Sequence, residues 1–566
     1  MKRVHKSHTL TGALLGAALV LAACGGGSDS ATEDAGGDST GKWATGDAKM
    51  TITYDIAENA VWEDNTPITW EDFECTALAA LKTPGSIATT GVDKITNIER
   101  GDSDKQVKVS FKATYAPWRG LFGGLIKKAA VANCADISQD FQTSIPFSGQ
   151  PWKMESWSPD QVVFVPNENY FGSKKASYSK LVMVPKIETQ IAALKAGEVD
   201  FIFPQFYAGI DKELEDANIT QVTKYGRDFE ALYFNLGVDG KDADGNPRVF
   251  ADPAYREAFY KSIDLDALLK QIYIPINPNA SLLTCGPITP GPYCPEGLFG
   301  NKYDQAAADK IMTDAGYAKD GSGLWAKDGV APKVRWVVNT GNTRRESTQA
   351  YLIPLFRKAG FNVEADNSDA DTYFQKRLPG MDYDLAMYIS VAPPDPAYLV
   401  GSFAGDQVPT AENGNRGGNF QGWVNDTATK LLNDSDNETD ATKRADLIKS
   451  AIVEIDKDYI MVPLFQFPNL GAYRKDKVSG TENNLANNAA FYDTYTWTDV
   501  DGDGQVIIGA EQWPSCLNPV TECASSSWAA WTGSQNLMPG VFVTTDDGRY
   551  EVTEMMAGEP KVVLLD

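Results

Sequence analysis

The chain has 566 residues, of which 43% are hydrophobic, and a formal net charge of −25 at pH 7. A chain of this length forms one very large domain or roughly two to three lobes. Because a strongly acidic chain is repelled by phosphates and by anionic lipid, we expect no nucleic-acid partner.

The first residues resemble an export signal followed by a lipid-attachment site. After a basic start, residues 10–22 are apolar but too short for a confident membrane-spanning helix, and 21–24 read Leu-Ala-Ala-Cys. This pattern resembles a bacterial lipobox, which predicts removal of residues 1–23 and acylation of Cys24. The alternative is a plain signal peptide with a chance cysteine. Residues 24–45 are rich in Gly, Ser, Asp and Glu, so we expect a flexible tether.

Histidine and cysteine usage narrows the possible chemistry. The two histidines, His5 and His8, lie in the predicted signal, so the exported chain has no imidazole. This excludes Ser-His-Asp and Cys-His catalysis and histidine-ligated metal sites, and leaves a carboxylate pair as the remaining hydrolytic chemistry. Besides Cys24, six cysteines remain, an even number that favours disulfides in an oxidising compartment. The expected pairs are Cys285–Cys294, Cys516–Cys523 and, by elimination, Cys75–Cys134.

The stretch Val61–Phe73 reads as a strand end, a tight turn and a helix start. It follows an alternating strand, Met50–Ile56, and Asn65 tolerates the left-handed backbone of a turn. Thr69 is a good N-cap with acidic residues after it, so we expect a helix to about Leu81. The sequence also predicts a strand at 107–111 and helices at 118–129 and 189–199, with Gly197 as the C-cap of the last.

Four motifs in order resemble the peptide/nickel/dipeptide class, family 5, of extracytoplasmic solute-binding proteins that serve ABC transporters. They are Val61–Phe73, with Asn65 in place of the usual Gly, then 145–154, 162–171 and Ala196–Phe201. The resemblance continues through 233–236, which is similar to the family's hinge strand, and covers roughly residues 50–480.

The second half of the chain alternates between helical and strand patterns, which is typical of an α/β lobe. Helices are expected at 255–269, 304–315, 346–359, 427–432 and 441–456, and strands at 334–338, 383–390 and 459–467.

The resemblance implies an α/β, two-lobed periplasmic-binding-protein-like fold of type II, with an extra subdomain and a hinge between the lobes. The expected parts are 1–23 (signal peptide), 24–45 (tether), 46–235 (large lobe, first part, with the extra subdomain at about 57–165), 236–465 (second lobe) and 466–566 (completion of the large lobe).

The segment that begins a typical family member is missing before Met50, and similar sequence motifs occur at the other end of the chain. They run from the strand Gln505–Ala510 through Leu517-Asn518-Pro519 to 557–560. We therefore expect a circular permutation in which 505–566 replaces the family's first segment, and in which Gln505–Ala510 pairs with the sheet that holds Met50–Ile56. The alternative is an unrelated C-terminal extension.

The acidic joint at 499–504 resembles a calcium loop, with Asp499, Asp501 and Asp503 at alternating positions and Gly504 next. The carboxylate expected at the last position is one residue late, at Glu511. A solvated acidic linker is the favoured interpretation, so we expect no metal or cofactor.

Candidate ligand contacts follow from motif position. The resemblance places Asn419 and Trp423 in a cleft loop, and it suggests Trp152 as a cleft aromatic. In peptide binders of this family an aspartate neutralises the peptide's α-ammonium, and that position falls at Ala392 here. A shift of one residue could let Asp395 substitute.

Two functions are compatible with these patterns. The first is a monomeric, lipid-anchored protein on the outer face of the cell membrane or in the periplasm. It captures a small solute, an oligopeptide or dipeptide, and delivers it to ABC permease subunits without covalent chemistry. The alternative is a secreted, carboxylate-dependent glycoside hydrolase acting on the cell wall, which the 13 tryptophans and many acids favour.

Overall fold

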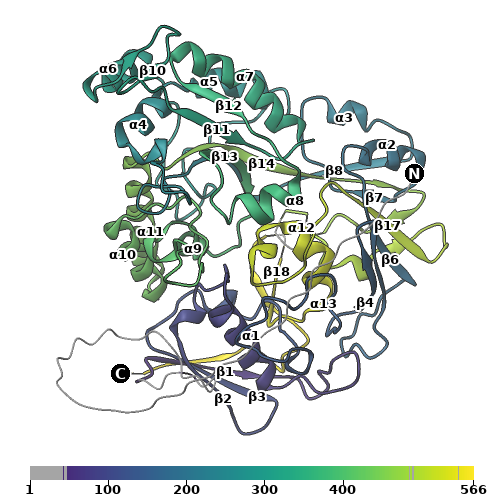
Figure 1. Ribbon diagram of the computed structural model, residues 1–566. Coiled ribbons are helices and arrows are strands. Elements are labelled where there is room, and N and C mark those ends of the chain that lie inside the picture. Colours follow the sequence, from purple (N-terminus) through teal and green to yellow (C-terminus); the bar gives the residue numbers. More distant parts are fainter. Residues whose placement is uncertain (1–42, 44–46, 484, 487–489, 546, 566) are drawn as a thin grey trace, which may run out of the picture.

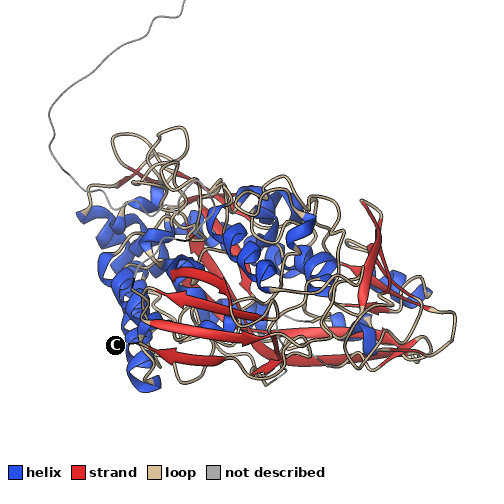
Figure 2. Ribbon diagram, turned by 90° about the horizontal axis from the view of Figure 1, so that it is seen from below, coloured by secondary structure: helices blue, strands red, loops and turns tan. Residues whose placement is uncertain are grey.

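The computed structural model describes residues 43, 47–483, 485–486, 490–545 and 547–565. The predicted signal peptide, Cys24 and nearly all of the tether lie outside these residues. Within the described part of the chain, no helix has both the length and the apolar character needed to cross a membrane. Figures 1 and 2 show two lobes, each built on part of one large sheet and covered by helices.

The large sheet has ten strands in the order β12-β11-β13-β8-β14-β7-β17-β6-β5-β4. One end belongs to the first lobe, where β17 lies parallel to and between β6 and β7. The other end belongs to the second lobe. The strands are β4 (Trp152–Ser158), β5 (Gln161–Pro166), β6 (Lys180–Pro185), β7 (Phe201–Ile202), β8 (Ile219–Phe234), β11 (Lys333–Val337), β12 (Asn362–Ala365), β13 (Leu385–Ser390), β14 (Met461–Arg474) and β17 (Gln505–Ala510).

The long antiparallel strands β8 and β14 join the lobes (Figure 1). Residues 229–234 of β8 pair with β13 in the second lobe, whereas β14 pairs with β7 in the first. Between these regions the register shifts at Gln466/Pro468, because proline has no N–H to donate to the ladder. The two strands therefore form the hinge, and their pairing is irregular where they leave the second lobe.

The Val61–Phe73 stretch has the predicted local structure. Asn65 has a φ of 64°, in the left-handed region, and α1 (Trp70–Lys82) begins after Thr69. The Asp72 side chain accepts from the Thr69 backbone N–H at 2.9 Å, which completes a capping box. Helix α1 packs beside a four-stranded sheet of order β2-β3-β1-β20, composed of β1 (Met50–Asp55), β2 (Ile95–Arg100), β3 (Gln106–Phe111) and β20 (Lys561–Leu564).

The predicted pairing of Gln505–Ala510 with the sheet of Met50–Ile56 is wrong, and the circular permutation that required this pairing is contradicted in that form. That segment is β17 in the ten-stranded sheet, while β1 lies in the four-stranded sheet. The C-terminal segment reaches β1 through β20, which pairs with it antiparallel from Thr53↔Lys561 to Met50↔Leu564. The Leu565 N–H also donates to the Lys49 carbonyl at 2.9 Å, so the two chain regions end side by side.

Most predicted helices are present, but the one at 118–129 is wrong. Only short 3-10 turns occur there, at Trp118–Gly120 and Lys128–Ala130. Gly120, Gly123 and Gly124 weaken a helix by their conformational freedom, and Phe122 has a positive φ. The 255–269 pattern forms two helices, because Asp264 caps a new one. The other helices are α2 (Gln190–Ala196), α3 (Ile210–Glu213), α4 (Pro253–Lys261), α5 (Leu265–Leu268), α6 (Gln305–Asp314), α7 (Thr343–Ala359), α8 (Ala370–Thr372), α9 (Tyr398–Phe403), α10 (Asp426–Asn437), α11 (Ala441–Lys457), α12 (Ser527–Ala529) and α13 (Gln535–Leu537).

Short hairpins and three disulfides complete the fold. The remaining strands are β9 (Ala318–Lys319), β10 (Trp325–Ala326), β15 (Val478–Ser479), β16 (Thr498–Asp499), β18 (Phe542–Thr544) and β19 (Tyr550–Val552). The predicted pairs Cys75–Cys134, Cys285–Cys294 and Cys516–Cys523 are confirmed. One buried apolar cluster unites the first lobe with the four-stranded sheet, and separate clusters fill the second lobe on the two faces of its sheet.

Candidate functional site

A cavity of about 530 Å³ lies between the two lobes, within the size range of ligand sites. Its walls come from the loop after α1, from both hinge strands, from the second lobe and from the C-terminal segment. Among the described residues, eight aromatic side chains line it, from Phe203, Phe374, Tyr388, Tyr398, Phe420, Phe467, Trp528 and Trp531.

Contacts between the lobes close one side of this cavity. The Gly85 N–H donates to the Gly414 carbonyl and the Gly417 N–H donates to the Ser86 carbonyl, both at 2.9 Å. The Arg416 guanidinium donates to the Leu81 carbonyl at the end of α1 at 2.7 Å. The segment that follows α1 is thus held against the 404–417 loop of the second lobe.

The loop that contains the Cys516–Cys523 disulfide makes a second contact between the lobes. The Gln375 amide of the second lobe donates to the carbonyls of Cys516 at 3.2 Å and Cys523 at 2.9 Å. The Ser515 N–H donates to the Asp371 carboxylate at 2.9 Å. This small disulfide loop therefore presents its carbonyls to the second lobe.

A buried charge cluster lies at the hinge. Glu230 on β8 accepts from Arg344 at 2.6 Å and from Arg345 at 2.8 Å, and all three side chains are almost completely buried. Although burial raises its pKa, the two guanidiniums hold the pKa of Glu230 below its ordinary value. Arg344 also donates to the Phe206 carbonyl of the first lobe at 2.7 Å, so the cluster ties the N-terminal end of α7 to both lobes.

Two more acids line the cavity, Asp228, which is buried, and Glu511, which is half-buried. Glu511, directly after β17, accepts from the Gln205 side chain at 2.7 Å and from the Gln512 amide at 3.0 Å. Asp228 on β8 is 3% exposed and accepts from the Asn469 amide at 2.7 Å. Burial raises the pKa of Asp228 to about 7 and also raises that of Glu511.

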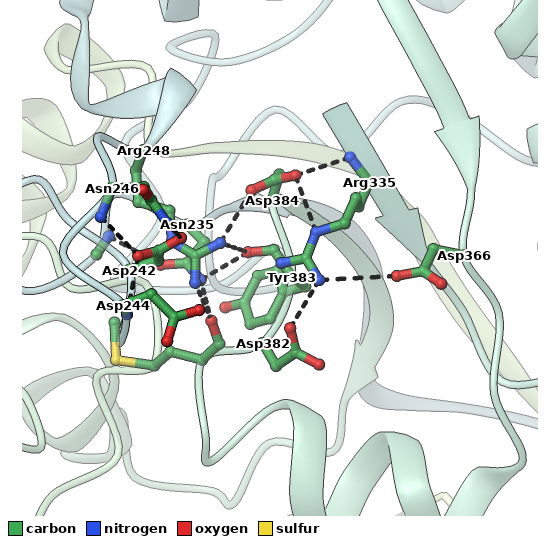
Figure 3. Close-up of polar contacts among 12 residues, drawn as sticks. Asn235, Asp242, Asp244, Asn246, Arg248, Arg335, Asp366, Asp382, Tyr383 and Asp384 are labelled. Atoms are coloured by element: carbon green, nitrogen blue, oxygen red, sulfur yellow. Dashed lines mark hydrogen bonds and ion pairs between the residues drawn. The ribbon is translucent and has the colours of Figure 1, made fainter. Parts of the chain in front are cut away.

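A polar network supports the second-lobe side of the site (Figure 3). Asp384 lies between two arginines and accepts from the Arg248 guanidinium at 2.9 Å and from the Arg335 backbone N–H at 2.8 Å. The Asn235 amide, at the end of β8, donates to the Tyr383 carbonyl at 2.7 Å. The Tyr383 hydroxyl in turn donates to the carbonyl of Phe420, a cavity-lining residue, at 2.9 Å.

The structure places Asn419 and Trp423 beneath the cleft loop, away from the cavity. The Asn419 amide is fully buried and donates to the carbonyls of Ala404 and Trp423, at 3.0 and 2.9 Å. The Trp423 indole is 2% exposed and donates to Asp458 at 2.9 Å. Both side chains shape the loop, while Gly418 and Phe420 line the cavity.

Asp395 and Trp152 also lie outside this cavity. Asp395 forms a bidentate ion pair with Arg444 at 2.6 and 2.8 Å, and lines a separate cavity of about 340 Å³. Trp152 is 1% exposed, donates to the Thr494 hydroxyl at 3.2 Å and packs on Tyr178 in the first-lobe core.

A lysine of the chain itself, Lys477, lies against the acidic joint at 499–504. The carboxylates of Asp499, Asp501 and Asp503 approach within 4.8 Å of one another. The Lys477 ammonium contacts Asp501 and lies 4.0 Å from Asp503, while Asp499 accepts from the Gly502 and Gly504 backbone N–H groups. Lys477 thus neutralises part of the cluster.

The residues that carry charge and aromatic surface into the cavity were not among those predicted from the sequence. Asp228 lies two residues before Glu230 within a long strand that is buried at this end, and an acid in such a strand is a signal for function. Trp528 and Trp531 are spaced three residues apart, so a short helical segment can present both on one side.

Comparison with known proteins agrees with this geometry. Residues 39–409 match the model described as bacterial extracellular solute-binding proteins, family 5 Middle. The oligopeptide-binding protein OppA of Bacillus subtilis is 24% identical over 438 residues, which cover 71% of this chain and 74% of OppA.

Solved structures share the fold. AppA from Bacillus subtilis, in complex with a nonapeptide, gives a TM-score of 0.70 at 17% identity and covers 80% of this chain and 88% of its own. NikZ from Campylobacter jejuni, in complex with Ni(L-His), gives a TM-score of 0.67 at 19% identity, and the match covers 81% of this chain and 90% of NikZ. The relatives named here are binding proteins and not enzymes, so the hydrolase alternative is not supported. The chain belongs to family 5 of the bacterial extracellular solute-binding proteins.

Proposed function

We propose that this chain is the lipid-anchored solute-binding component of an ABC importer, and that its solute is an oligopeptide or dipeptide. The observation that carries the proposal is the 530 Å³ cavity closed between two lobes that share a two-stranded hinge. A cavity with walls from both lobes can trap a solute by rotation about the hinge, without covalent chemistry. The lipobox-like Leu-Ala-Ala-Cys24 sequence supports the anchor.

The relatives support a peptide as the solute. OppA is named for oligopeptide binding, and AppA was solved with a nonapeptide. The aromatic side chains and the polar groups that line the cavity suit a ligand with alternating apolar and amide groups. Delivery then requires permease subunits that recognise the closed pair of lobes, with the chain acting as a monomer.

Native mass spectrometry of the protein purified from its own host tests this proposal. We expect a co-purifying mass that fragments as a short peptide, and a protein mass that includes acyl groups at Cys24. Recovery of a sugar, or of a metal chelate without a peptide, would contradict the proposed solute. An unmodified thiol at Cys24 would contradict the anchor.

A further inference from the structure

The cavity carries an unbalanced negative charge when both of its lining acids are ionised. Its charged lining residues, among those that the structure describes, are Asp228, Arg345 and Glu511. Behind them lie Glu230 and Arg344, which ion-pair with each other. Three acids, of which two are buried and Glu511 is half-buried, therefore face two buried guanidiniums. Because a buried charge without a partner is costly, the closed cavity favours a ligand that brings one positive charge.

Asp228 is the acid with unused hydrogen-bonding capacity. Glu511 accepts at both carboxylate oxygens from Gln205. The Asn469 amide donates to Oδ2 of Asp228 and the Ala392 backbone N–H also faces this carboxyl, whereas no described residue meets hydrogen-bond geometry at the buried Oδ1. A cavity-lining carboxylate with one oxygen free of hydrogen bonds can accept a hydrogen bond from a donor on a ligand.

The hinge irregularity explains how Asp228 reaches the cavity. Phe229 pairs with Gln466, but the next pair is Tyr225 with Pro468, so β8 has two residues more than β14 in this interval. Such a bulge bends the strand and re-aims its side chains. The Gln466 amide holds the bulge by donating to the Gly226 carbonyl at 2.6 Å. The charge on Asp228 is thus presented at the point about which the lobes rotate.

We propose that Asp228 binds a protonated amine of the solute, so that cationic solutes with a free amino group are selected and held at the hinge. This inference rests on the proposed function, in that it names the chemistry of the solute in the same cavity. The ammonium donates to Oδ1 while Asn469 keeps Oδ2 occupied. The amine can belong to a peptide's N-terminus or to a simple aliphatic amine.

Calorimetric titration of the full chain with three probes tests the assignment. The probes are a mixture of short peptides with free N-termini, the same mixture after N-acetylation, and a linear aliphatic diamine without peptide bonds. We compare the wild type with Asp228→Asn, which removes the charge at constant size. Asp228→Glu tests rescue of the charge, and Asp160→Asn changes an exposed acid outside the cavity.

We expect Asp228→Asn to weaken binding of the free peptides about 30-fold or more, because removing one partner leaves a buried charge unpaired. Asp160→Asn should bind like the wild type, and Asp228→Glu should recover part of the loss. Binding of the diamine but not of peptides, dependent on Asp228, would keep this inference while the proposed peptide solute fails. Equal binding of free and acetylated peptides, unchanged affinity in Asp228→Asn, or no binding of either amine would overturn it.

Discussion

Asp436 on α10 gives a sharp test of how buried acids at the contact between the lobes affect stability. Its backbone carbonyl accepts from the Ala116 N–H of the first lobe at 2.7 Å. Its carboxylate is fully buried, neither oxygen has a hydrogen-bond partner among the described residues, and burial raises its pKa to about 7. The ionisable groups that face it are Lys94, Arg444, Asp395, Asp93 and Tyr115.

The magnitude follows from proton linkage. The carboxyl has a pKa of about 7 in the folded chain against an ordinary value of 3.8, so the folded chain binds more protons between these pH values. Stability therefore falls as pH rises through this window. From pH 5 to pH 8, ionisation of Asp436 lowers the free energy of unfolding by about 2.5 kcal/mol. With an unfolding entropy of about 1 kcal/mol/K for some 500 residues, this corresponds to about 2–3 °C in Tm.

The assay is thermal unfolding of the wild type and Asp436→Asn at pH 5 and pH 8. The amide does not titrate, so the fall in Tm between the two pH values should be about 2–3 °C smaller in the variant. Any constant cost of the amide itself shifts both values equally and cancels. Asp160→Asn, at an exposed acid, should follow the wild type. Parallel pH dependences of the wild type and Asp436→Asn would refute the reasoning.

Three further predictions concern the hinge and the chain order. Glu230→Gln should lower the free energy of unfolding by about 3–5 kcal/mol, because two buried guanidiniums lose their counter-charge, and denaturant unfolding measures this. Binding of an amine by the wild type should weaken as pH falls below about 7, because Asp228 must lose a proton to pair with the amine. Calorimetric titrations at several pH values check this. The affinity of Asp228→Asn should lack this pH dependence. A chain in which Leu565 is joined to Lys49 by a short turn and opened within 499–504 should fold and bind as the natural order does, because Leu565 and Lys49 already lie side by side. An unfolded product would contradict this expectation.

Local chemistry made several features predictable from the sequence. The turn at Asn65, the capping box of α1 and the left-handed Gly197 each depend on neighbours within a few residues. Two disulfides followed from short spacings, and Cys75–Cys134 followed by elimination from an even count of cysteines. The helix expected at 118–129 does not form, because three glycines in this segment favour loop backbone.

The candidate site was less predictable because a motif places a loop and does not fix which side chain faces the ligand. The 417–423 loop does line the cavity, through Gly418 and Phe420. The Asn419 side chain instead forms hydrogen bonds within the loop region. The direction of the Asp228 side chain depends on a register shift between two strands that are more than 200 residues apart in the sequence. No local sequence pattern predicts such a shift. Ala392, where the resemblance places an acid, is buried, and its backbone N–H helps to lower the pKa of the Asp228 carboxyl.

The C-terminal segment connects chain order with the cavity. In sequence it is one unit, but it completes two sheets, since β17 fills the gap between β6 and β7 and β20 pairs with β1. Between these strands the same segment supplies Glu511 and the two cavity tryptophans. The first-lobe wall is therefore incomplete until the last residues have folded onto strands that precede them by several hundred positions. Because such distant pairing must form before either lobe can close on a solute, we expect solute binding to appear only with the final folding step.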